Sequence, residues 1–189
     1  MIHSGNFYLS RSQMEDNATY IYGFMLNKGW TLNAICGMLG NMETESTINP
    51  AIWQNLDQGN TSLGFGLVQW TPATKYLDWC SNNGLTYTEM DSNLKRILYE
   101  VENNLQWIAT NSYNFSFYEF TQSNKSPYEL GLAFLANYER PKNPNQPQRG
   151  TQANEWYQFL TGVTPPDPDP HPPFIPKSKM PIYMMLKKY

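Results

Sequence analysis

Two neighbouring segments hold the residues best suited to acid–base chemistry. Glu43 and Glu45 lie at the end of a stretch with apolar residues at helical spacing, and the glycine-containing segment Gly64–Trp70 follows. Cleavage of a glycosidic bond needs a carboxyl group that is protonated near neutral pH, so that it can donate to the leaving oxygen. The last turn of a helix and apolar neighbours both favour the protonated form. Periodicity does not choose between Glu43 and Glu45, and a glutamate at a helix end is also commonly a solvated surface residue.

Most other catalytic chemistries are excluded by the residue types available. The only histidines are His3, in the N-terminal arm, and His171, in a proline-rich stretch. Ser-His-Asp catalysis, Cys-His catalysis and zinc sites of the usual composition are therefore not expected. The segment that begins at Gly64 lacks the third glycine of a dinucleotide-binding loop. A net charge of −3 argues against a nucleic-acid partner.

Neither a targeting segment nor a membrane span is expected. The N-terminus has no basic region leading into an apolar stretch, so no secretory signal is predicted, and delivery outside a cell would need another route. No run approaches eighteen apolar residues, so no membrane partner is predicted. Cys36 and Cys80 fall in helix-like patterns and are expected to be small buried side chains, although the sequence leaves a disulfide open.

The local patterns predict an α+β domain that is predominantly α. Ser10 and Gln13 form a capping box, and Thr31 is the expected N-cap of a second helix that ends near Glu45. The two glycines between Leu63 and Trp70 predict a short strand, which would be the small β element. Four further helices are predicted. The first begins at Thr71, with Pro72 in its first turn, and the second runs from Asp91 to Ile108. The third runs from Ser126 to Arg140, and the last from Thr151 to Gly162.

The composition changes sharply after residue 163. Seven of the fourteen prolines lie between Thr164 and Pro176, which is typical of a semi-rigid extended spacer. The sequence therefore predicts a folded domain over residues 1–163, a linker over 164–176 and a short tail over 177–189. The tail is too short for a core of its own and is a docking segment, the stub of a longer protein, or disordered.

One hexapeptide carries a family resemblance. The segment Glu45-Ser46-Thr47-Ile48-Asn49-Pro50 is similar to the Glu-Ser-x-x-x-Pro signature of lysozyme-superfamily lytic transglycosylases and goose-type lysozymes. Gly66-Leu67-Val68-Gln69 matches the Gly-Leu-x-Gln segment that lines the cleft in that family. The resemblance implies a lysozyme-like domain in which Glu45 is the general acid and Gln69 contacts the substrate. It also implies an aromatic residue on the far side of the cleft, which Tyr138 could supply.

A narrower likeness extends over residues 8–160. These residues resemble the lysozyme domain of tail-knob peptidoglycan-degrading proteins of small short-tailed phages of Gram-positive bacteria, and the segment 138–141, Tyr-Glu-Arg-Pro, is one of the shared strings. The likeness implies a bacteriolytic glycosidase, a muramidase that cleaves the β-1,4 bond between N-acetylmuramic acid and N-acetylglucosamine, without metal or cofactor. It implies a place in the virion tail, with the peptidoglycan glycan strand and tail-knob proteins as partners. The larger relatives continue into a zinc metallopeptidase domain, and no such activity is predicted here.

The second carboxyl group of such a site has one candidate in the sequence. Goose-type enzymes place an aspartate two residues after the cleft glutamine, where this chain has Thr71. Asp57 is the remaining candidate for a water-positioning base, or it serves only as a turn residue. Trp70 and Tyr138 are candidates to stack on sugar rings, although aromatic residues at such positions more often belong to the core.

Four functions remain open at this point. The first prediction is a muramidase that belongs to the virion tail. The same activity would also fit an endolysin that lyses the host. A base acting on water from across the sugar would give an inverting hydrolase. Without a second carboxylate, a lytic transglycosylase with an anhydro product is expected instead. The last alternative is a tail module that binds the wall without cleaving it.

Overall fold

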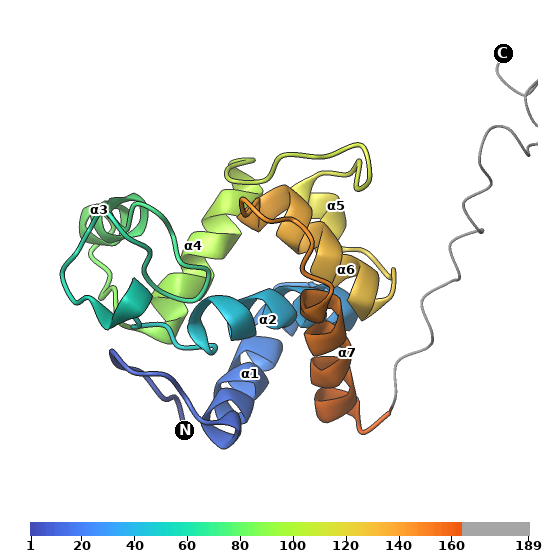
Figure 1. Ribbon diagram of the computed structural model, residues 1–189, viewed down its shortest axis with the longest axis horizontal. Helices are drawn as coiled ribbons and strands as arrows, with labels where there is room; N and C mark the ends of the chain where they lie inside the picture. The colour runs from blue at the N-terminus through green and yellow to red at the C-terminus, as the bar shows by residue number, and fades with distance from the viewer. Residues whose placement is uncertain (164–189) are drawn as a thin grey trace, which may run out of the picture.

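The computed structural model describes residues 1–163, which form helices arranged around α2 (Figure 1). The linker and tail predicted for 164–176 and 177–189 lie outside the described residues. The helices are α1 (Arg11–Leu26), α2 (Leu32–Ser46), α3 (Thr74–Asn82), α4 (Met90–Glu102), α5 (Phe117–Thr121), α6 (Pro127–Phe134) and α7 (Gln148–Thr161). A 3₁₀ turn, η1 (Gln54–Leu56), precedes α3, and a π-helical turn, η2 (Leu135–Glu139), continues α6.

Capping chemistry sets several helix ends where the sequence predicted them. The Ser10 side chain accepts from the backbone N–H of Gln13, and the Gln13 side chain accepts from the backbone N–H of Ser10, which completes a capping box. Thr31 caps α2 and Ser126 caps α6 through the same kind of side-chain bond. At the end of α7, Gly162 has φ 70°, a left-handed conformation that glycine adopts without a steric penalty.

The segment predicted as a strand is a tight turn. Phe65 and Trp70 bond to each other through both backbone groups, at 3.3 and 3.1 Å, and Phe65 also forms an isolated bridge with Trp53. Gly66 (φ 80°) and Gln69 (φ 49°) are left-handed and reverse the chain between them. No strand occurs in residues 1–163, so the predicted β element is not confirmed and the described fold is helical.

Three predicted helix boundaries were wrong. The Thr71–Pro72 peptide is cis, the Thr71 hydroxyl bonds to the Gln69 carbonyl, and α3 begins only at Thr74. The helix predicted to reach Ile108 ends at Glu102, because the chain leaves the helix through Asn103 and a left-handed Asn104. The last helix starts at Gln148 rather than Thr151.

The core forms where α2 packs against α1, α6 and α7 (Figure 1). The apolar stripe of α2 is fully buried, as its period predicted, and comprises Ile35, Met38, Leu39 and Met42. Cys36 and Cys80 are free and buried, in agreement with the sequence. None of the helices in the described part of the chain is both long and apolar enough to cross a membrane.

Gly40 allows α2 and α7 to approach closely. A Cβ atom at this position would lie 2.4 Å from the carbonyl oxygen of Arg149 and 2.7 Å from the backbone nitrogen of Ala153. We expect Gly40→Ala to lower the free energy of unfolding by about 1–3 kcal/mol, because backbone atoms cannot yield as a flexible side chain would. Urea denaturation measures this change. Gly23→Ala in α1 is the control: nothing lies within 4 Å of its Cβ position, and alanine should stabilise that helix slightly.

Candidate active site

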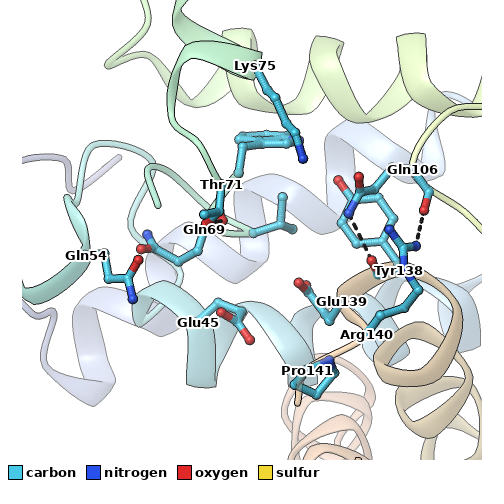
Figure 2. A pocket seen from close by; sticks show the side chains of 12 residues that line it. Glu45, Gln54, Gln69, Thr71, Lys75, Gln106, Tyr138, Glu139, Arg140 and Pro141 are labelled. Atoms are coloured by element: carbon cyan, nitrogen blue, oxygen red, sulfur yellow. Dashed lines mark hydrogen bonds between the residues drawn. The ribbon is translucent and has the colours of Figure 1, made fainter. Parts of the chain in front are cut away.

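A cleft of about 440 Å³ opens where the end of α2 meets the turn at 64–70 and η2 (Figure 2). Glu45 enters it from α2, Gln69 and Trp70 from the turn, and Tyr138 and Glu139 from η2. Four of the five residues selected from the sequence therefore line one cavity, although they are separated widely along the chain. Asp57 is the exception.

The serine that follows Glu45 fixes the end of α2 against the turn. Ser46 is buried, and its hydroxyl donates to the carbonyl of Leu67 at 2.8 Å. The next residue, Thr47, ends the helix in a left-handed conformation (φ 52°). The Glu-Ser pair and the Gly-Leu-x-Gln segment are thus two halves of one contact, and this contact positions Glu45 at the cleft wall.

Arg149 of α7 holds the Glu45 carboxylate. Its Nη2 lies 2.6 Å from Glu45 Oε1, and the Arg149 side chain is only 4% exposed. Nη1 donates to the backbone carbonyl of Asn41 at 2.9 Å, and Nε donates to the side chain of Gln146 at 3.0 Å. A guanidinium fixed by two other hydrogen bonds gives Glu45 a defined orientation.

The two glutamates at the end of α2 face different surroundings. Glu43 points toward Arg11, whose Nη1 lies 3.7 Å from Glu43 Oε1, and it does not line the cleft. Burial raises the pKa of Glu43, so a raised pKa in this helix is not confined to the cleft. Position in the cavity therefore separates Glu45 from Glu43, which periodicity could not do.

The side-chain nitrogen of Gln69 is bonded to backbone carbonyls beside the cleft. Its Nε2 donates to the carbonyl of Gly66 at 2.9 Å and lies 3.3 Å from the carbonyl of Ile52. Within residues 1–163, no hydrogen bond to its Oε1 is formed. The amide nitrogen is thus bonded to the backbone of the turn, and the oxygen is the side-chain atom left to accept from a sugar hydroxyl.

The two aromatic residues of the cleft also belong to the core. Trp70 is 3% exposed and Tyr138 is 1% exposed. Trp70 Nε1 donates to Glu100 Oε1 at 2.9 Å, and the Tyr138 hydroxyl donates to Glu100 Oε2 at 2.5 Å. Arg96 reaches the same carboxylate at 2.9 Å. Sequence reasoning did not identify Glu100, which ties both rings to α4 and so shapes one wall of the cleft.

Comparison with known proteins agrees with the resemblance found in the sequence. Residues 16–160 match the family model for the phage tail lysozyme domain. The chain belongs to the phage tail lysozyme family. It is 67% identical over 162 residues to morphogenesis protein 1 of Bacillus phage B103, across 86% of this chain and 44% of that protein. The chain thus spans less than half the length of this relative.

Asp57 of this phage tail lysozyme domain lies outside the cleft lining. It is exposed, and its carboxylate accepts a hydrogen bond from the side chain of Asn60, Nδ2, at 2.8 Å within the same turn. Thr71, which stands where goose-type enzymes have an aspartate, does line the cleft. Among the residues that line this cavity, the second carboxyl group belongs to Glu139.

Sequence reasoning missed Glu139, although it directly follows Tyr138. Figure 2 shows Glu45 and Glu139 on facing sides of the pocket, with their carboxyl ends turned toward its interior. Burial raises the pKa of Glu139 well above its usual range, and the nearby charge of Glu45 raises it further against the opposing effect of Arg149. Its Oε1 is buried without a hydrogen-bond partner.

The cavity offers no evident ligand set for a metal ion. Within residues 1–163, no group of three or more His, Cys, Asp or Glu side chains is placed to hold one. Two acidic and two basic side chains line the cleft: Glu45, Glu139, Lys75 and Arg140. Such a lining suits a neutral ligand with many hydroxyl and amide groups, which requires hydrogen bonds from several directions.

Proposed function

We propose that this domain is a peptidoglycan muramidase that cleaves the β-1,4 bond between N-acetylmuramic acid and N-acetylglucosamine. The observation that carries the proposal is the meeting of Glu45, Gln69 and the Trp70 edge in one cleft. Membership of the phage tail lysozyme family supports the same reaction class. The family name and the phage relative support a virion tail component that opens the wall at the start of infection.

The chemistry follows from the two sides of the cleft. A carboxyl proton passes to the glycosidic oxygen as the C1–O bond breaks, and the bonding electron pair goes to that oxygen. Water then adds to C1 and returns a proton to a carboxylate. In this proposal a sugar hydroxyl or amide donates to Gln69 Oε1, while the buried rings of Trp70 and Tyr138 form the wall behind the bound sugar.

Replacement of the acid tests the proposed activity. We expect Glu45→Gln to reduce the release of soluble fragments from purified Gram-positive cell walls by at least about 100-fold, since glutamine cannot supply a proton. Glu43→Gln, two residues earlier in the same helix and outside the cleft, is the matched control and should cleave like the wild type. Equal clearing by wild type and Glu45→Gln would contradict the proposal, as would no clearing by either protein.

Product analysis separates hydrolysis from transglycosylation. Mass spectrometry of the digested wall should find reducing muropeptides that carry the added water. Products that lack this water would instead identify a lytic transglycosylase. Binding to walls without any soluble product would identify a wall-binding tail module.

A further inference from the structure

The cleft contains two carboxyl groups in unequal surroundings. Glu45 forms an ion pair with the fixed guanidinium of Arg149, which provides the donor that a carboxylate needs. Glu139 also lies near Arg149 and Arg140, but its Oε1 is buried without any donor. Burying a charged oxygen without a hydrogen bond is costly, so Glu139 is the member of the pair that is more stable when protonated.

The wider charge environment points the same way. The groups that act on Glu139 are Glu45 from α2, Glu100 from α4, Arg149 from α7 and the adjacent Arg140. Arg140 directs its Nη1 to the backbone carbonyls of Gln106 and Asn137, so these hydrogen bonds are not available to Glu139. The negative charge of Glu45 in the same cavity thus favours a proton on Glu139.

From these contacts, and resting on the muramidase function proposed above, we propose that Glu139 is the second catalytic carboxyl group and shares a single proton with Glu45. The pair donates this proton to the glycosidic oxygen as the C1–O bond breaks. It then receives one proton from the water that adds to C1. The pair thus begins and ends each cycle with one proton and one negative charge, and no further reactant is required.

Glu139, and not Asp57, supplies the second carboxyl group of the cleft. Asp57 is exposed and bonded within its own turn, whereas Glu139 faces Glu45 across the cavity. Burial keeps Glu139 protonated to a higher pH than an ordinary glutamate, which suits a group that donates to a glycosidic oxygen.

Glu139→Gln tests the proposal because glutamine has nearly the shape of a protonated glutamate. If Glu139 only fills space, this variant should cleave walls like the wild type with the same pH profile. If it shares the catalytic proton, activity at neutral pH should fall by at least about 100-fold. The residual activity should move to lower pH, since the second carboxylate that retained the proton is gone. Wild-type activity and pH profile in Glu139→Gln would overturn the inference.

Comparison with Glu45→Gln keeps this inference separate from the muramidase proposal. An inactive Glu45→Gln with a fully active Glu139→Gln would leave the proposed function intact and refute only the shared proton. The fold of Glu139→Gln is checked by its melting temperature. Because burial raises the pKa of Glu139, the stability associated with its protonated form is lost as pH rises through that pKa. The variant should therefore melt no earlier than the wild type at pH 8.

A titration without substrate examines the pair directly. Carboxyl ¹³C NMR of the wild type should show Glu139 titrating above the usual glutamate range. In Glu45→Gln the pKa of Glu139 should fall, since the neighbouring negative charge is removed. In Glu43→Gln it should not move. A Glu139 titration that is the same in Glu45→Gln and the wild type would show that no proton is shared, and would overturn the inference.

Discussion

Arg149→Met is expected to lower the free energy of unfolding by about 3–5 kcal/mol and to remove most wall-cleaving activity. The substitution leaves Glu45 in its half-buried position without a counter-charge, and the removal of one partner from a buried ion pair has a cost of this size. It also leaves the carbonyl of Asn41 without its donor. Urea denaturation followed by tryptophan fluorescence measures the stability, and release of wall fragments measures the activity.

A neighbouring cation provides the control for Arg149. Lys142→Met removes the same charge from an exposed position and should change stability by no more than about 0.5 kcal/mol. The double variant Arg149→Met with Glu45→Gln should be more stable than Arg149→Met alone, because no buried charge is then left unpaired. If Arg149→Met unfolds like the wild type, the ion pair does not hold α7 against the end of α2.

The parts of the fold that depend on short-range chemistry could be predicted from the sequence. Ser10, Thr31 and Ser126 cap helices because each side chain bonds to a backbone N–H three residues ahead. Interactions beyond that range were not visible. Ile108 continued the apolar period of α4, yet its backbone N–H bonds to the carbonyl of Asn137 instead of continuing the helix. The turn at 64–70 has β-like composition, but left-handed residues fold it back on itself.

The same limit applies to the site. Glu45 and Gln69 could be selected because their motifs are continuous in sequence, and both lie at the cleft. Arg149 contacts Glu45 across 104 residues and lies between the predicted helices that end at Arg140 and begin at Thr151, so the ion pair could not be anticipated. Glu139 had one signal in the sequence: a carboxylate directly after the aromatic residue expected at the far wall. The sequence alone could not show that its oxygen would be buried without a donor.

Glu100→Ala is expected to lower the free energy of unfolding by about 3–5 kcal/mol and to weaken substrate binding. Glu100 is 1% exposed and accepts hydrogen bonds from Trp70, Arg96 and Tyr138. Truncation leaves three donors unsatisfied in the interior, one of them charged, and opens a cavity between α4 and η2. Urea denaturation measures the loss, with Glu102→Ala on the exposed side of α4 as a control that should change stability by no more than about 0.5 kcal/mol.

The effect of Glu100→Ala on substrate binding shows whether the hydrogen bonds to Glu100, or ring packing alone, fix this wall of the cleft. Trp70 and Tyr138 come from segments far apart in the chain, and Glu100 is the group to which both rings bond. If this carboxylate sets the cleft wall, then at temperatures where Glu100→Ala remains folded its KM for soluble glycan fragments should rise about tenfold or more, a change of about 1.4 kcal/mol. Its kcat should fall less, since Glu45 and Arg149 belong to other helices. An unchanged KM would mean that ring packing alone maintains this wall.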